Sequence, residues 1–188
     1  SSLLLFSCSK ATHTGTTPIP PSSSASVIDL SPTLESRILG GTQHYAVYLP
    51  PSYTKEPQRK YPVLYLLHGM YQDYKSWFSD GGLQAAADKA IAEGVVEMII
   101  ICPNGFNSFY YNTMDMRYED FFIQEFIPEI ERRYRILSEK EHRNIAGLSM
   151  GGFGATYLAF QHHELFGNAY STSGGFIEPA TTLLKDII

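Results

Sequence analysis

Short apolar runs recur along the chain and predict the strands of a β-sheet. Residues 61–67 and 95–102 are almost entirely apolar, which is typical of strands that a sheet buries on both faces. Residues 43–49 alternate polar and apolar positions and end at a pair of prolines, which predicts a strand followed by a loop. Two later runs, 144–148 and 168–173, predict further strands.

Segments with helical spacing lie between these runs. Residues 83–92 predict a helix, and Gly94 is its natural C-terminal stop. Residues 118–134 also keep helical spacing, and Pro128 predicts a kink because it lacks a backbone donor. A third helix is expected at 152–161. This alternation predicts an α/β fold, with a mostly parallel sheet and helices on both of its faces.

The first 26 residues differ in composition from the rest of the chain. An apolar stretch precedes Cys8, as at the end of a bacterial lipoprotein signal peptide, and this predicts that Cys8 carries a lipid. Residues 11–26 are rich in Thr, Ser and Pro and predict a disordered tether. We therefore expect residues 1–26 to be a signal remnant and tether. Residues 27–188 are then the folded domain, anchored outside the cytoplasm on the outer membrane or the periplasmic face.

The overall composition is that of a soluble globular protein. The 188 residues are 44% hydrophobic and 18% charged, with a net charge of −5, and no basic patch suggests a nucleic-acid partner. No apolar run approaches the roughly 20 residues of a membrane-spanning helix. Cys8 and Cys102 alone do not support a disulfide framework. Neither a phosphate-binding loop nor clustered metal ligands are visible, so we expect no cofactor and no metal.

A Gly-x-Ser-x-Gly motif lies between a predicted strand and a predicted helix. A tight turn of this kind forces Ser149 into a strained backbone conformation with an exposed side chain. Gly147 and Gly151 then lack a Cβ so that strand and helix can pass close together. The N–H groups at the start of the helix favour a developing negative charge. The motif predicts that Ser149 is a nucleophile; an incidental serine in a glycine-rich turn is the alternative.

Five ordered segments resemble the putative-esterase group of the α/β-hydrolase superfamily. This group includes feruloyl, acetyl xylan and tributyrin esterases and S-formylglutathione hydrolases. The matching segments are YPVLYLLHG at 61–69, PNG at 103–105 with NSFY at 107–110, YEDF at 118–121, IP at 127–128, and the serine motif itself. Together they cover about residues 42–176.

The resemblance implies ester hydrolysis through a serine acyl-enzyme. It assigns the attack on the ester carbonyl to Ser149, and the oxyanion hole to the backbone N–H groups of Met150 and Met70. His68 corresponds to a loop histidine with a structural part. Gln72 departs from the group, in which glycine is common at this position, and is expected to restrict the oxyanion loop.

The expected substrates are feruloyl or acetyl esters of plant polysaccharide. They fit a protein anchored outside the cytoplasm better than S-formylglutathione, which is a cytosolic thioester. Phe109, Tyr110 and Tyr111 are expected either to line a pocket for the acyl or sugar side or to pack in the core. Two alternatives stay open, an acyltransferase on the same fold and a non-catalytic glycan-binding surface lipoprotein.

In this fold the nucleophile is followed along the chain by an acid and then by a histidine. The histidines after Ser149 are His162 and His163, roughly 18 Å away if the helix rises 1.5 Å per residue. They precede Asp186, the only later aspartate, which reverses the order. We therefore expect the triad acid and histidine to lie beyond Ile188, with this chain holding the N-terminal two-thirds of an esterase domain. Its incomplete sheet would leave an exposed edge prone to association.

Overall fold

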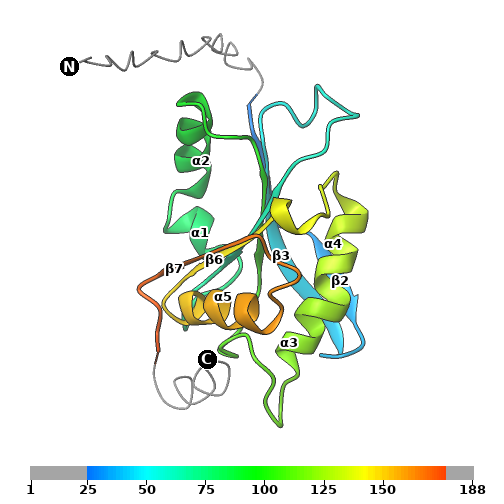
Figure 1. Cartoon of the computed structure of the whole chain (residues 1–188), viewed down its shortest axis with the longest axis vertical. Coiled ribbons are helices and arrows are strands. Elements are labelled where there is room, and N and C mark those ends of the chain that lie inside the picture. Colours follow the sequence, from blue (N-terminus) through cyan, green and yellow to red (C-terminus); the bar gives the residue numbers. More distant parts are fainter. Residues whose placement is uncertain (1–24, 177–188) are drawn as a thin grey trace, which may run out of the picture.

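A computed structural model describes residues 25–176, and a sheet with helices on both faces runs through them (Figure 1). Residues 1–24, with the predicted lipidation site Cys8 and most of the tether, lie outside the described residues, as do residues 177–188.

The elements follow the order expected from the sequence, with several additions. The strands are β1 (Val27–Asp29), β2 (Thr33–Ser36), β3 (Gly41–Leu49), β4 (Val63–Leu67), β5 (Ile99–Pro103), β6 (Arg143–Leu148) and β7 (Asn168–Thr172). The helices are α1 (Ser76–Ser79), α2 (Leu83–Ala92), α3 (Tyr118–Phe121), a π-helical turn (Phe122–Phe126), α4 (Ile127–Arg133), a 3₁₀ turn (Lys140–His142) and α5 (Met150–Gln161). In this part of the chain, no helix combines the length and the apolar character needed to cross a bilayer.

The sheet has a parallel part and an antiparallel part. Its strand order is β1-β3-β5-β4-β6-β7, and β2 pairs with the first residues of β3. Strands β5, β4, β6 and β7 run parallel, whereas β3 is antiparallel to β5 and to β1. The α/β prediction is therefore confirmed. The register between β4 and β6 ends at Leu67 opposite Gly147, which brings the loop after β4 beside the turn after β6.

Successive side chains on the strands point to two separate cores. Helices α3, α4 and α5 cover one face of the sheet, and α1 and α2 cover the other (Figure 1). The larger core is rich in aromatic rings and includes Tyr65, Phe122, Phe126, Ile130, Phe153 and Leu158. The smaller core holds Tyr48, Leu66 and Ile100 against Trp77 and Leu83. Helices on both faces were predicted, and they are present.

Strand β7 forms one edge of the sheet. Among the described residues it pairs only with β6, and the side chain of Tyr170 is 70% exposed. Unpaired backbone groups on such a strand are the feature that favours association of sheets. Association of this protein through β7 stays a prediction.

The helix predicted over residues 118–134 is present as one continuous helical run from Tyr118 to Arg133, with a π-helical turn in its middle. The N–H of Ile127 bonds to the carbonyl of Phe122, five residues earlier, which makes the turn before α4 π-helical. Pro128 follows this turn directly, in the first turn of α4, and has no N–H to donate to the carbonyls of the preceding turn. The widened turn accommodates the proline within the helix, and the kink stays a prediction.

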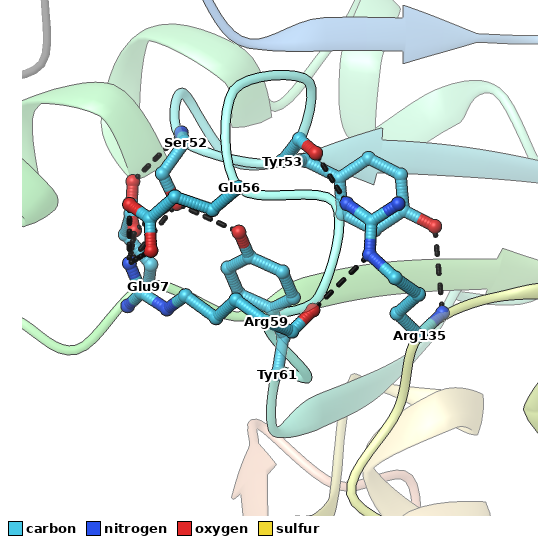
Figure 2. Close-up of polar contacts among 7 residues, drawn as sticks. All are labelled: Ser52, Tyr53, Glu56, Arg59, Tyr61, Glu97 and Arg135. Carbon is cyan, nitrogen blue, oxygen red and sulfur yellow. Dashed lines mark hydrogen bonds and ion pairs between the residues drawn. The ribbon is translucent and has the colours of Figure 1, made fainter.

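A polar network fixes the loop that leads into β4 (Figure 2). This loop enters the sheet beside the start of β6, whereas the Ser149 turn follows the end of β6. The hydroxyl of Ser52 donates to Glu97 at 2.5 Å, and the guanidinium of Arg59 pairs with the same carboxylate at 2.7 Å. Arg135 lies 3.7 Å above the ring of Tyr53 and donates to the carbonyl of Arg59 at 3.1 Å. These contacts tie residues 52–60 to the sheet, so their role is structural.

Candidate active site

The turn at Ser149 joins β6 to α5. Strand β6 ends at Leu148 and α5 begins at Met150, so the serine alone makes the turn. Its φ of 53° and ψ of −114° lie outside the regions that residues with a side chain usually adopt. Such a conformation costs on the order of 1–3 kcal/mol and persists only where its surroundings hold it in place. The local geometry is that of a strained strand-to-helix elbow.

Two glycines allow the strand and the helix to meet at this elbow. A Cβ on Gly147 would lie 2.2 Å from the carbonyl oxygen of Gly151. A Cβ on Gly151 would lie 2.4 Å from the carbonyl oxygen of Leu67, at the end of β4. Both contacts are with backbone atoms, which cannot swing aside as a side chain can. The packing of β6, α5 and β4 therefore requires glycine at both positions.

Neighbouring backbone groups hold Ser149 in its strained conformation. Its N–H donates to the carbonyl of Thr172 at 3.0 Å, and its carbonyl accepts from the N–H groups of Gly175 at 2.9 Å and Phe153 at 3.0 Å. The residue is half-buried, and its hydroxyl makes no hydrogen bond within residues 25–176. The segment from β7 to Gly175 thus supports the elbow through its backbone.

Two backbone N–H groups are candidates for an oxyanion hole. Met150 is the first residue of α5, so its N–H has no acceptor within the helix. Met70 follows β4 in the loop that lies beside the elbow. Neither N–H donates to another group in the described part of the chain. Both residues predicted from the sequence therefore lie on segments that meet at Ser149.

His68 links the loops after β4 and β5. Its Nε2 accepts from the N–H of Gly105 at 2.8 Å, so Nδ1 carries the proton and donates to the carbonyl of Gly69 at 2.8 Å. The side chain is buried, and burial lowers the pKa of His68, which favours the neutral ring that this bonding needs. Both ring nitrogens are engaged, so the structural part expected for His68 agrees with its contacts.

The oxyanion loop is shaped by two side-chain amides, of which the sequence pointed to only one. The Oε1 of Gln72 accepts from the N–H of Gly69 at 2.8 Å, and the Oδ1 of Asn107 accepts from the N–H of Tyr71 at 2.8 Å. The left-handed residue of the loop is Tyr71, with a φ of 65°. Gln72 thus acts on the loop through its side chain. Asn107 lies in a segment that matches the family. Its contact joins two loops that are distant in the sequence, so the residues around Asn107 could not predict it.

The three aromatic residues at 109–111 have different surroundings. Tyr110 is fully buried and donates its hydroxyl to the carbonyl of His68 at 2.9 Å, so it belongs to the core and not to a pocket. Phe109 and Tyr111 are half-buried and pack edge-on against Phe153 of α5, with ring centroids 5.9 and 6.3 Å away. Of the three, Phe109 and Tyr111 remain candidates for a substrate-facing surface.

No histidine within residues 25–176 hydrogen-bonds to Ser149. His162 caps the far end of α5 and binds Glu119 at 2.8 Å, while His163 is exposed beside it. His44 is exposed and stacks on Tyr74 with ring centroids 5.6 Å apart. The described residues also hold no cluster of three or more side chains suited to a metal ion.

Residues 36–184 match the family model described as "Putative esterase". The chain belongs to this family. A protein of Xylanibacter ruminicola named endo-1,4-beta-xylanase/feruloyl esterase is 33% identical over 156 residues, which cover 78% of this chain and 22% of that protein. An esterase of Mycobacterium tuberculosis is 33% identical over 148 residues, or 74% of this chain and 31% of that protein.

Solved structures of esterases share the fold. A ferulic acid esterase superimposes with a TM-score of 0.77 at 38% identity, covering 81% of this chain and 60% of that one. A feruloyl esterase module from Clostridium thermocellum, complexed with sinapinate, gives a TM-score of 0.64 at 27% identity, covering 80% and 53%. The predicted α/β-hydrolase fold and esterase family are therefore confirmed. The chain spans less than two thirds of the length of each of these four proteins.

Proposed function

We propose that the whole protein is a carboxylic ester hydrolase that works through an acyl-enzyme on Ser149. The observation that carries this proposal is the strained elbow, which presents an unpartnered serine hydroxyl beside two backbone N–H groups without acceptors in residues 25–176. A 12-residue helix, α5, begins at the elbow and directs its N-terminal dipole towards the same place. Membership in the esterase family supports the same reaction.

The geometry supports an addition–elimination sequence. The oxygen of Ser149 attacks the ester carbonyl carbon, and the carbonyl electron pair moves onto its oxygen, which accepts hydrogen bonds from the N–H groups of Met150 and Met70. Collapse of this tetrahedral species releases the alcohol and leaves the acyl group on the serine, and water then releases the acid. A base takes the serine proton and returns it to the leaving alcohol oxygen, and in the second half it takes a proton from water and returns it to the serine. We place this base in a part of the whole protein outside residues 25–176, together with the triad acid.

We propose feruloyl or acetyl esters of plant polysaccharide as substrates. Support comes from the names of the relatives, which include a xylanase/feruloyl esterase and a ferulic acid esterase. Half-buried Phe109 and Tyr111 offer aromatic surface for an aryl acid. A location outside the cytoplasm, with Cys8 lipidated, completes this proposal because polymeric substrates do not enter cells.

The proposal is tested on the protein expressed from the complete reading frame that contains this chain. A fluorophosphonate probe should label one peptide, 143–161, in the wild type and none in Ser149→Ala. Labelling should persist in the control Ser138→Ala, which removes an exposed serine before β6. Methyl ferulate and acetylated xylan should be hydrolysed only by the labelled proteins, and added alcohol acceptors should not capture the acyl group. Labelling of Ser149→Ala at the wild-type rate contradicts the proposed nucleophile, whereas efficient capture by an acceptor indicates an acyltransferase.

A further inference from the structure

Three consecutive N–H groups in the loop after β4 have different environments. The N–H groups of Gly69 and Tyr71 are each occupied by a side-chain amide oxygen, from Gln72 and Asn107 respectively. The N–H of Met70, between them, has no acceptor within residues 25–176. Of these three N–H groups, the loop thus leaves available only that of Met70, which the proposed reaction uses together with the N–H of Met150.

We propose that Gln72 and Asn107 are positioning residues of the oxyanion hole, which fix the Met70 N–H by holding the peptide groups on either side of it. This inference rests on the proposed function of Ser149. Neither side chain is assigned a contact with substrate. Both act through the backbone of the loop.

Gln72 closes the loop in two ways. Its backbone N–H donates to the carbonyl of Gly69 at 3.3 Å, while its side-chain oxygen accepts from the N–H of the same glycine at 2.8 Å. The carbonyl of Gly69 also accepts from Nδ1 of His68. Both polar groups of Gly69 are therefore held. A Cβ at Gly69 would lie 2.9 Å from the Gln72 oxygen, so the side chain fits against a residue without one.

Asn107 holds the other side of Met70. Tyr71 has a φ of 65°, a conformation that costs a bulky residue on the order of 1–3 kcal/mol. Its side chain is 86% exposed, so packing of the ring does not hold the backbone in this state. Two hydrogen bonds hold it instead: the Tyr71 N–H donates to Asn107 at 2.8 Å, and the Gln72 N–H donates to the Gly69 carbonyl across the turn that contains Tyr71.

The loop that supplies Asn107 is itself fixed. The N–H of Gly105 donates to His68 at 2.8 Å, and its carbonyl accepts from the hydroxyl of Ser108 at 2.6 Å. The two loops are thus tied together at His68 and again at Asn107. A clamp anchored in this way can hold a donor within the few tenths of an ångström that oxyanion stabilisation requires.

The test uses the protein from its complete reading frame and two variants, Gln72→Met and Asn107→Leu, which replace the side-chain amide by an apolar group of similar size and so remove the acceptor oxygen. Misplacing a group in an active site by about 1 Å costs up to about 100-fold in rate, so kcat for methyl ferulate should fall roughly 10- to 100-fold in each variant. KM should stay within about twofold. Affinity for an arylboronic acid, whose tetrahedral adduct places an oxygen in the oxyanion hole, should fall in parallel with kcat, while product inhibition by ferulate should not change.

A matched control and a rescue separate positioning from folding. Asn112 makes the same kind of bond on an exposed turn before α3, where its Oδ1 accepts from the N–H of Asp120 at 3.1 Å. Asn112→Leu should therefore leave kcat within about twofold of wild type. Asn107→Asp restores an acceptor oxygen and should recover much of the kcat that Asn107→Leu loses.

Amide hydrogen exchange tests the geometry without any activity. In the wild type the amides of Gly69 and Tyr71 should exchange more slowly than that of Met70, and each should lose protection in the variant that removes its acceptor. The inference is overturned if all three amides exchange at the same rate. It is also overturned if the enzyme is active and neither variant changes kcat or the affinity for the boronic acid. A wild type with the expected exchange pattern that neither reacts with a fluorophosphonate nor hydrolyses esters contradicts the proposed function instead.

Discussion

The close contact between β6 and α5 leads to a quantitative prediction for Gly147→Ala. The added Cβ would lie 2.2 Å from the carbonyl oxygen of Gly151 and 2.3 Å from its carbonyl carbon. Ordinary contacts begin at 3.4 Å, so the strand and the helix would have to separate by about 1 Å. Pairing with β4 on one side and β7 on the other opposes that movement of β6.

Overpacking of a well-packed interior typically costs about 1–3 kcal/mol, and occasionally more. Backbone atoms lie on both sides of this contact, so we expect Gly147→Ala to lower the free energy of unfolding by about 3 kcal/mol or more. Gly82→Ala is the matched control. Gly82 has a φ of 59°, and a Cβ added there would have nothing within 4 Å, so alanine adds only the left-handed backbone cost, about 1–2 kcal/mol.

Urea unfolding followed by the fluorescence of Trp77 measures the difference between the two variants. With a urea dependence of about 1–3 kcal/mol per molar, a loss of 3 kcal/mol lowers the midpoint by at least about 1 M. Gly147→Ala should also lose fluorophosphonate labelling, since the elbow cannot close. If Gly147→Ala is no less stable than Gly82→Ala, the steric explanation of the first glycine in the motif is wrong.

Three further predictions concern the buried ring of His68, the ion pair between Arg143 and Glu131, and the activity of the isolated chain. Burial lowers the pKa of His68 in the folded protein, so the unfolded chain binds a proton at this histidine more readily than the folded one. The free energy of unfolding that His68 contributes is therefore present above about pH 6.5 and should be lost as the pH falls below that value. In His68→Leu, urea titrations at pH 7.5 and 5.5 should show a smaller pH effect and a loss of about 1–3 kcal/mol at the higher pH, because the N–H of Gly105 loses its acceptor. Arg143→Met leaves the carboxylate of Glu131 without its partner at 2.7 Å and should cost about 3–5 kcal/mol in chemical denaturation, whereas the double variant with Glu131→Gln should recover part of that loss. The isolated 188-residue chain should hydrolyse p-nitrophenyl acetate negligibly, since no described histidine reaches Ser149; a burst of p-nitrophenol that disappears in Ser149→Ala would contradict this.

Local patterns predicted the regular elements well. The helix at 83–92 has the predicted bounds, and β6 and β7 differ from their predicted bounds by one residue at one end. Strand β5 begins at Ile99 and not at residue 95, because Val95 turns back to bond the carbonyl of Ala90 at 3.0 Å. Apolar character alone could not reveal this turn.

The features that the sequence did not predict depend on contacts between distant segments. Strands β1 and β2 have three and four residues, too few for a periodic signal, and exist because β3 offers them a partner. The sequence left open whether Tyr110 lines a pocket or packs in the core, and it is buried because the glycines at 105 and 154 leave room for its ring. The contact of Asn107 with Tyr71 joins positions 36 residues apart. The spacing of residues within a motif does not show which distant segments come into contact.

In the proposed reaction, the nucleophile depends on backbone geometry, whereas its base depends on the position of a side chain. The strain at Ser149, on the order of 1–3 kcal/mol, is offset by its own backbone hydrogen bonds, each worth about 1 kcal/mol, and two of these come from Thr172 and Gly175. Backbone groups within residues 25–176 are therefore enough to build the elbow and to place two N–H donors. A base instead needs a ring nitrogen within about 2.6–3.2 Å of the hydroxyl. The nitrogens of His68 are engaged by the two loops, and His162 is engaged by Glu119. For the proposed reaction, the described residues thus supply the nucleophile and the backbone donors, and we infer that the base comes from a segment outside residues 25–176.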